Sequence, residues 1–175
     1  MPRKIVLYIA ESLDGYIATK DDTLEWLFNT EGEGDNGYSD FYNTVDTIIL
    51  GRRTYDWIIN HEGDNFPYMN KQCFVFSRTL SGKNQFVEFA NENIIDFANK
   101  LKLTVGKNIW IVGGGEILHD FTEYQLVDEW IINIAPTIIG DGIPLSTKLT
   151  TETCLKLINV RRFNQFTELH YETVK

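Results

Sequence analysis

Apolar runs alternate along the chain with segments of helical spacing, and this pattern predicts a series of strands and helices. Four runs are apolar almost throughout, as expected for strands buried on both faces of a sheet; they cover residues 4–11, 47–50, 72–76 and 109–112. A weaker strand is predicted at residues 86–89. Apolar residues with helical spacing predict helices at residues 40–45, 55–59, 94–103 and 116–126.

The last third of the sequence changes from alternating elements to strands alone. Residues 129–135, 155–160 and 166–171 predict strands, and the polar segment 161–165 joins the last two as a hairpin. Strands alternating with helices favour a parallel sheet, and a terminal run of strands favours an antiparallel edge. No linker or repeat interrupts residues 1–175. We therefore expect one α/β domain with a mostly parallel central sheet and an antiparallel C-terminal edge strand.

The centre of this pattern is the stretch Ile109–His119, which reads as strand, glycine turn and helix. The apolar strand ends at Gly113-Gly114-Gly115, and Glu116 and Ile117 open the helix. Without Cβ atoms, a phosphate can approach the backbone of such a turn, and the helix start offers unpaired N–H groups. A tight turn without a ligand is the alternative, because three glycines alone are a weak signal and match neither the Rossmann nor the P-loop spacing.

Three predicted parallel strands end in groups suited to an anion. These ends are Gly51-Arg52-Arg53-Thr54, Ser77-Arg78 and Gly113-Gly114-Gly115. Because ligands bind outside the carboxyl ends of strands in open α/β sheets, we expect the three ends to share one ligand. The arginines would hold a phosphate by charge-assisted hydrogen bonds, with the hydroxyl groups of Thr54 and Ser77 as further donors. For each arginine alone, a solvated charge at a helix start is the alternative.

The net charge of the chain limits the kinds of partner that it is expected to bind. The chain carries a formal net charge of −9 with 43% hydrophobic residues, which is typical of an acidic globular protein. Nucleic acids and anionic membranes both demand a basic face, so we expect neither as a partner. An anionic ligand would instead need a local group of arginines or lysines.

Cysteine and histidine positions give no sign of a metal site. Cys73 and Cys154 lie in apolar stretches without a CxxC pair, which predicts two buried thiols in a reducing compartment. The three histidines share no ligand spacing with cysteines or carboxylates, so we expect no metal. We see no signal peptide and no apolar run of membrane-spanning length, and we expect a cytoplasmic protein.

Several of these motifs resemble the dihydrofolate reductase superfamily. They are IAESLDGYIA at residues 9–18, ILGRRTYDWI at 49–58, VFSR at 75–78 and VGGGEIL at 112–118. The pair SLDGYIA and PTIIGDGIPL is more similar to the branch related to the reductase domain of bacterial riboflavin biosynthesis. The motifs occur in the family's order over nearly the whole chain. The resemblance implies the three-layer dihydrofolate reductase-like fold.

The resemblance also implies NADPH as hydride donor. Ser77 and Arg78 would reach the 2′-phosphate, and Gly51 starts the segment in which Arg52, Arg53 and Thr54 would hold the adenosine phosphates. The three glycines with Glu116 and Ile117 would wrap the pyrophosphate, with a cis peptide between Gly113 and Gly114. Ala10 and Ile17 match backbone positions that contact the nicotinamide carboxamide.

The sequence departs from the family at positions that concern the substrate. Dihydrofolate reductases have a carboxylate just before the Trp-bearing segment, where Thr23 stands here, which disfavours folate reduction. Riboflavin-pathway reductases typically have Glu before the glycines, where Val112 stands here. Trp26, Tyr55 and Val112 are our candidates for the substrate wall. Asp14 is our candidate acid, with a turn-forming role as an equal alternative.

We therefore expect an NADPH-dependent reductase that transfers a hydride to a C=N or C=O carbon of a small heterocyclic or ribosylamino-pyrimidine-like substrate. The alternatives are a dihydrofolate reductase and a non-catalytic NADPH-binding module. Relatives with segments like PTIIGDG often pair through this region, so we expect a homodimer. Trp130, Ile132, Ile138 and Ile139 are the apolar residues considered for its interface.

Overall fold

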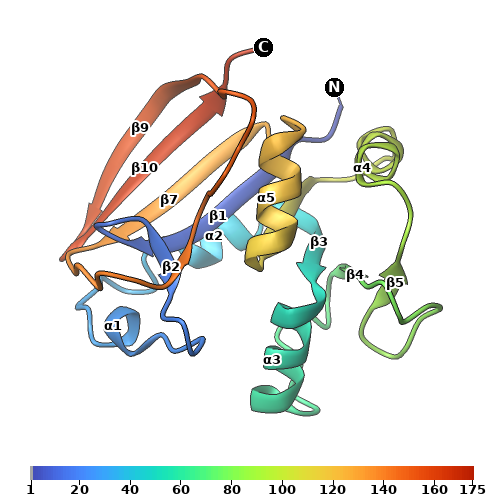
Figure 1. The fold of residues 1–175 in the computed structure, drawn as a ribbon, viewed down its shortest axis with the longest axis horizontal. Coiled ribbons are helices and arrows are strands. Elements are labelled where there is room, and N and C mark those ends of the chain that lie inside the picture. The colour runs from blue at the N-terminus through green and yellow to red at the C-terminus, as the bar shows by residue number, and fades with distance from the viewer. Residues whose placement is uncertain (1) are drawn as a thin grey trace.

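An eight-stranded sheet forms the middle of the molecule in the computed structural model, which describes residues 2–175. Its strand order is β5-β4-β3-β6-β1-β7-β10-β9 (Figure 1). The strands are β1 (Ile5–Ser12), β3 (Val45–Gly51), β4 (Gln72–Phe76), β5 (Glu88–Ala90), β6 (Asn108–Gly113), β7 (Glu129–Ala135), β9 (Leu155–Phe163) and β10 (Phe166–Thr173). Neighbouring strands from β5 to β7 are parallel, and β10 and β9 continue the sheet antiparallel.

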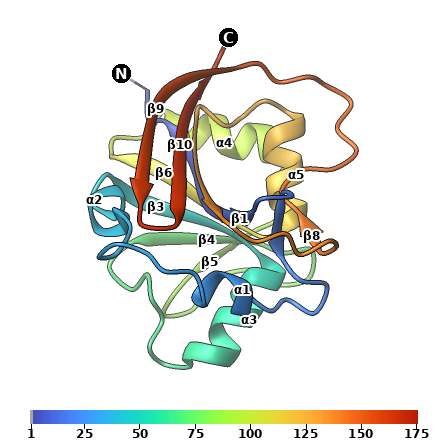
Figure 2. The ribbon, with the colours of Figure 1, turned by 90° about the vertical axis from the view of Figure 1, so that its left-hand side faces the viewer.

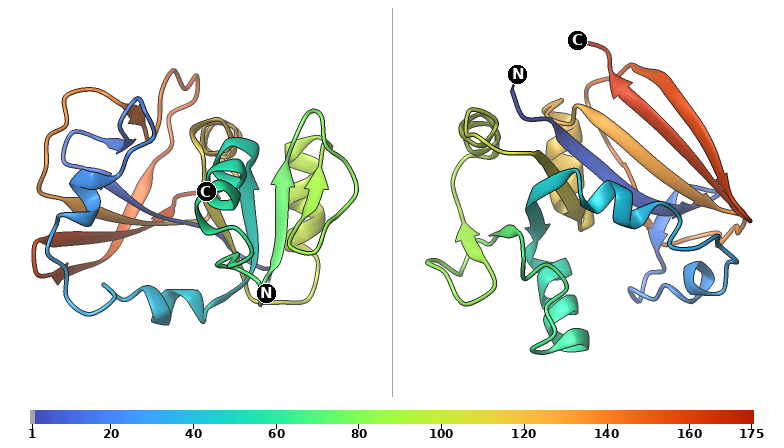
Figure 3. Two further views of the ribbon diagram at one scale, coloured as in Figure 1. Left: turned by 90° about the horizontal axis from the view of Figure 1, so that it is seen from below. Right: turned by 180° about the vertical axis from the view of Figure 1, so that it is seen from behind.

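Helices cover both faces of this sheet. They are α1 (Glu25–Phe28), α2 (Tyr38–Tyr42), α3 (Arg52–Glu62), α4 (Ile94–Lys102) and α5 (Gly115–Glu123). Alternate residues of each central strand enter opposite cores, because side chains alternate across a strand: Ile49 packs with α4 and α5, and Leu50 with α2 and α3. The result is the three-layer α/β fold that the sequence predicted, seen from further sides in Figures 2 and 3.

The two strands at the C-terminal edge are longer than the sequence pattern predicted. β9 and β10 form a long hairpin, and β10 pairs with β7 (Figure 2). A separate two-stranded sheet joins β2 (Tyr16–Ala18) to β8 (Ile143–Pro144), segments that are far apart in the sequence. Neither short strand was predicted, because each is only two or three residues long and its pairing is set by tertiary contact.

Two local predictions were wrong. The helix expected at residues 40–45 is α2 at Tyr38–Tyr42, because the fully buried Val45 already belongs to β3. The Asp35 carboxylate accepts hydrogen bonds from the backbone N–H groups of Gly37 (3.1 Å) and Ser39 (2.9 Å) at the start of this helix. Cys154 is exposed rather than buried, whereas Cys73 is buried as predicted.

The homodimer stays a prediction. Trp130 and Ile132 are buried in the core of the subunit, whereas Ile138 is 70% exposed. The outer strand β9 also exposes apolar side chains that the sequence pattern did not single out, namely Leu155, Leu157, Ile158 and Val160. No helix within residues 2–175 is long and apolar enough to cross a membrane.

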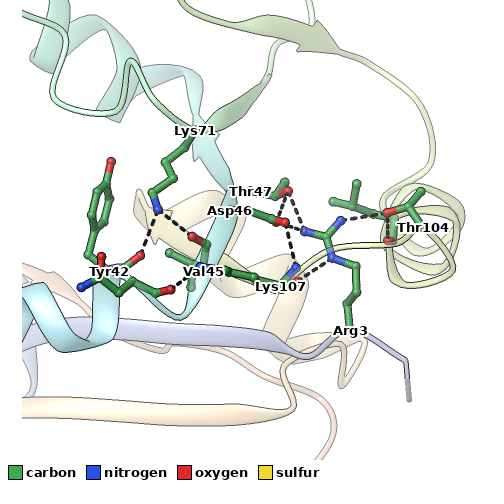
Figure 4. A network of polar contacts seen from close by, with 10 residues as sticks. Arg3, Tyr42, Val45, Asp46, Thr47, Lys71, Thr104 and Lys107 are labelled. Atoms are coloured by element: carbon green, nitrogen blue, oxygen red, sulfur yellow. Dashed lines mark hydrogen bonds and ion pairs between the residues drawn. The ribbon is translucent and has the colours of Figure 1, made fainter.

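A polar network around Arg3 fixes the amino-terminal side of the sheet (Figure 4). The buried Arg3 guanidinium donates hydrogen bonds to the Lys107 carbonyl oxygen (2.6 Å) and to the hydroxyl groups of Thr104 (2.8 Å) and Thr47 (2.7 Å). It also pairs with the Asp46 carboxylate. Arg3 thereby joins the start of β3 to the loop between α4 and β6.

Replacing Arg3 by methionine should lower the free energy of unfolding by about 1–3 kcal/mol. The variant leaves the Lys107 carbonyl, the Thr104 and Thr47 hydroxyls and the half-exposed Asp46 without their shared donor. Urea unfolding measures the change, and Arg162→Met is the matched control, because Arg162 is exposed and its side chain donates a hydrogen bond to the nearby Asn164 carbonyl (2.8 Å). Equal losses in both variants would contradict a structural role for this network.

Candidate cofactor and substrate site

A large cavity lies at the carboxyl ends of the parallel strands, where the sequence predicted a ligand. It has a volume of about 1080 Å³ and reaches the ends of β1, β3, β4 and β6. All residues predicted to contact the cofactor line it: Ala10, Ile17, Gly51, Arg52, Arg53, Thr54, Ser77, Arg78, Gly113, Gly114, Gly115, Glu116 and Ile117. Val112, a candidate for the substrate wall, lines it as well. The three strand ends therefore do face one space.

Two helices begin at this cavity with uncapped N-termini. The helix α3 continues directly from β3 (Figure 1). The N-caps of α3 and α5 are Gly51 and Gly114, and neither glycine has a side chain that could accept a hydrogen bond from the first turn. The first N–H groups of a helix have no partner within the helix, and the helix dipole makes this end partly positive. Both features favour an anion between the two helix starts.

The turn at Gly51 and the turn at Gly113-Gly114 approach each other so closely that side chains would not fit between them. The bond between Gly113 and Gly114 is cis, as the resemblance implied, and Gly113 has φ +132°, a conformation that favours glycine. A Cβ placed on Gly51 would lie 3.1 Å from the Gly114 nitrogen, and one on Gly114 would lie 3.0 Å from Thr54 Oγ1. The absence of side chains thus lets α3 and α5 present their first turns to one ligand.

The three arginines differ in how far they are already paired. The Arg52 guanidinium donates to the Asp56 carboxylate (2.9 Å) one helical turn on, and more weakly to the hydroxyls of Ser77 (3.4 Å) and Thr79 (3.3 Å). Arg53 donates to Asp22 (2.6 Å). Arg78 is exposed and forms no ion pair within residues 2–175. Arg78 is therefore the cation with most freedom to meet a phosphate.

Ser77 is buried and organises the turn that carries Arg78. Its hydroxyl oxygen accepts hydrogen bonds from the backbone N–H groups of Thr79 (3.2 Å) and Leu80 (2.9 Å). Its own N–H donates to the Ala90 carbonyl on β5 (3.0 Å). The turn after β4 is thus held from two sides, which fixes the position from which the Arg78 side chain extends.

Asp14 lies outside the cavity, so the geometry favours its turn-forming alternative. Its carboxylate accepts hydrogen bonds from the Ser12 hydroxyl (2.6 Å) and from the backbone N–H groups of Ile139 (3.2 Å) and Gly140 (2.8 Å). The Ser12 hydroxyl, followed by these N–H groups, lowers the pKa of the exposed Asp14 carboxyl. Such a carboxyl is ionised at neutral pH and has no proton to donate. Asp14 instead joins the turn after β1 to the loop before β8.

Two aromatic candidates for the substrate wall also lie outside this cavity. Tyr55 is on the inner side of α3, where its ring packs against Phe89 and its hydroxyl oxygen accepts a hydrogen bond from Asn84 (2.9 Å). Trp26 is half-buried on α1 and does not border the cavity. Trp57, two residues further along α3, packs half-buried against the same core and also lines the cavity, with its ring stacked on His61.

The structure adds wall residues that no local motif indicated. Leu24, Leu27, Asn91, Glu92, Asn93, Asp120, Tyr124 and Ile143 line the cavity as well. They come from loops and helices whose approach depends on the whole fold, although Asn93 carries a local signal as the N-cap of α4. Its side-chain oxygen accepts from the N–H groups of Ile95 (3.0 Å) and Asp96 (3.2 Å). No group of three or more potential metal ligands occurs among the residues described.

Comparisons with known proteins give the family. The family model described as the RibD C-terminal domain matches residues 3–168. YwjB of Bacillus subtilis strain 168 is 49% identical over 172 residues, which are 98% of each chain. The crystal structure of a putative riboflavin biosynthesis protein from Shewanella sp. PV-4 is 28% identical and covers 100% of both chains with a TM-score of 0.88.

The fold is also that of dihydrofolate reductases. The structure of dihydrofolate reductase from Enterococcus faecalis, complexed with NADP(H) and RAB-propyl, matches with a TM-score of 0.66. It covers 98% of this chain and 97% of the other at 11% identity, a level at which only the fold is comparable. The matched residues include all three strand ends of the cavity, and this chain belongs to the RibD C-terminal domain family, with a dihydrofolate reductase-like fold.

Proposed function

We propose that the protein is an NADPH-dependent reductase that transfers a hydride to a C=N or C=O carbon of a small heterocyclic or ribosylamino-pyrimidine-like substrate. The observation that carries the proposal is the meeting of two uncapped helix starts and three arginines at one cavity, in a chain with a net charge of −9. An acidic protein that gathers positive groups in one place is suited to an anionic ligand.

The residues of the cavity fit a dinucleotide. The first turns of α3 and α5 would hold phosphates, because their N–H groups are uncapped and the glycines leave room for close approach. Arg78 would pair with the 2′-phosphate that distinguishes NADPH from NADH, since within residues 2–175 it forms no ion pair, unlike Arg52 and Arg53. Ala10 and Ile17, which line the same cavity nearer β1 and β2, would contact the nicotinamide carboxamide.

Positioning is the main contribution expected of the protein. When bound, NADPH supplies the hydride from its reduced ring. The apolar cavity residues, among them Ile9, Val112 and Ile143, would exclude water and hold the acceptor carbon in line. As the carbon takes the hydride, the double-bond electron pair moves to the nitrogen or oxygen, which takes a proton. Since Asp14 lies outside the cavity and is ionised, we assign that proton to a single bound water molecule in a site that otherwise excludes bulk solvent.

Replacing Arg78 by alanine should weaken NADPH binding by about tenfold to a hundredfold and leave NADH binding unchanged. The reason is the loss of a charge-assisted hydrogen bond to a group that only NADPH carries. Calorimetric titration of the nucleotide-free protein with both nucleotides measures the difference. Arg162→Ala is the matched control, because this exposed arginine lies on β9 and does not border the cavity.

The same titrations, together with assays of NADPH oxidation, separate the proposal from its alternatives. If neither nucleotide binds the native protein, the reductase proposal is wrong. NADPH binding without oxidation across a panel of pterins, aminopyrimidines and quinones would support a non-catalytic binding module. Oxidation of NADPH with dihydrofolate would support a dihydrofolate reductase.

A further inference from the structure

The wall of the large cavity carries carboxylates as well as arginines. They are Asp22, Asp56, Glu92, Glu116 and Asp120. A phosphate brings further negative charge into the same space, and like charges a few ångströms apart repel each other. The way in which each carboxylate is neutralised therefore affects which anions the cavity can accept.

Two of these carboxylates are paired with arginines of the wall itself. Asp22 pairs with Arg53 (2.6 Å) and Asp56 with Arg52 (2.9 Å), and both arginines line the cavity. A phosphate in the cavity can share these guanidinium groups with the carboxylates, because each guanidinium has several N–H donors. Both pairs are thus part of the proposed phosphate site.

Glu92 is neutralised by a cation from outside the cavity. Lys100 in the last turn of α4 donates from Nζ to Glu92 Oε2 (2.5 Å), and Lys100 does not border the cavity. The hydrogen bond to Glu92, followed by the charge of that carboxylate, raises the pKa of Lys100, so the ammonium is charged at neutral pH. Glu116 and Asp120 form no ion pair within residues 2–175. Among the residues described, Lys100 is therefore the cation that changes the charge of the wall without belonging to it.

The register of β4 and β5 brings Glu92 beside Arg78. These strands are parallel neighbours in which Phe76 lies opposite Ala90 (Figure 1), and the Ser77 N–H donates to the Ala90 carbonyl oxygen (3.0 Å). Arg78 and Glu92 each follow this pair by two residues, and both line the cavity. A group that meets Arg78 in the cavity therefore also meets the field of Glu92.

A carboxylate in this place distinguishes a ribose hydroxyl from a ribose phosphate. A hydroxyl group can donate a hydrogen bond to the carboxylate, whereas an ionised phosphate offers only acceptors and is repelled by it. With Lys100 in place, the charge of Glu92 is compensated and Arg78 can attract the phosphate. Without Lys100, Glu92 would offset the charge of Arg78 and favour the hydroxyl.

We propose that Lys100 determines the preference of the cavity for a ribose 2′-phosphate over a 2′-hydroxyl, by neutralising Glu92 beside Arg78. Lys100 is a positioning residue, because it acts through Glu92 and does not touch the ligand. The inference rests on the proposed function, since it concerns the same nucleotide, and it adds two residues that set the choice between NADPH and NADH.

The ratio of the NADH and NADPH dissociation constants, measured by calorimetric titration, tests the proposal. In Lys100→Met this ratio should fall about fivefold at low ionic strength, and at about 1 M salt it should equal the native ratio because the charges are then screened. Lys100→Arg should keep the native ratio. Lys156→Met is the matched control, because the side chains of Lys156 and Glu172 are 67% and 42% exposed, against 71% for Lys100 and 41% for Glu92.

The double variant Lys100→Met/Glu92→Gln separates charge from structure. It should regain the native ratio, because no uncompensated carboxylate is left beside Arg78. A native ratio in Lys100→Met at low salt would overturn the proposal. A lowered ratio that the double variant retains would overturn it as well, since Lys100 would then act by holding α4.

Glu92→Gln alone gives an independent measurement if Lys100→Met does not fold. This variant leaves the Lys100 ammonium uncompensated near Arg78, so the ratio should rise, and an unchanged or lowered ratio would contradict the proposal. Nucleotide binding with a ratio that no variant alters would count against this inference alone. Absence of binding by both nucleotides would contradict the reductase proposal and this inference with it.

Discussion

Replacing Gly51 by valine is expected to weaken NADPH binding by at least about a hundredfold, which corresponds to ~2.7 kcal/mol. A Cβ at this position would lie 3.1 Å from the Gly114 nitrogen, 3.4 Å from the Gly113 oxygen and 3.4 Å from Ile117 Cγ2. The two further methyl groups of valine would enter the same contact, so the start of α3 must move away from the glycine turn. The two helix starts would then no longer face one phosphate-sized space.

Calorimetric titration with NADPH, together with thermal unfolding, separates lost binding from lost structure. Gly82→Asn is the control, because Gly82 has φ +76°, a conformation that asparagine tolerates, and nothing lies within 4 Å of its added Cβ. The control should bind NADPH as the native protein does. Native affinity in Gly51→Val would mean that the contact between the two turns is not required for nucleotide binding.

Replacing Phe121 by alanine should lower the free energy of unfolding by about 3–5 kcal/mol. Phe121 is fully buried on α5, in the core that this helix forms with α4 and with strand residues of β1, β3 and β6, namely Ile5, Leu7, Ile49, Ile109 and Ile111. Removing the ring leaves a cavity that the surrounding strands cannot fill without moving. Because α5 begins at the glycine turn, the same change should weaken nucleotide binding indirectly.

The shift of the urea unfolding midpoint gives the loss, and an unchanged slope shows that the transition stays cooperative. Leu103→Ala removes a large apolar side chain that is 85% exposed and should change the free energy of unfolding by less than about 0.5 kcal/mol. A small effect of Phe121→Ala would indicate that α5 is held by its glycine turn rather than by its apolar face.

The glycine and arginine segments could be identified from the sequence because their signal is local. Each follows an apolar strand directly, and the carboxyl ends of parallel strands must meet at one edge of a sheet. Once the strands at residues 47–50, 72–76 and 109–112 were recognised, Gly51, Ser77 and Gly113 had to face one region. The structure places all of them on the same cavity.

The sequence could not settle the roles that depend on contacts between distant segments. Asp14 carries the same local pattern whether it faces a substrate or the N–H groups of Ile139 and Gly140, and only the fold brings that loop to it. Tyr55 lies two residues before Trp57 on α3, yet the helix buries Tyr55 in the core and leaves Trp57 half-buried at the edge of that core, where it also lines the cavity.

The sequence by itself therefore determined the order of the longer strands and helices, the family and the strand ends that line the large cavity. The tertiary structure alone decided which polar groups lie together across strands. Glu168 and Asn133 become neighbours through the antiparallel register of β10 on β7, and a shift of one residue would turn Glu168 to the other face. That register depends on the packing of the whole sheet and on the hairpin turn, and no local motif near either residue records it.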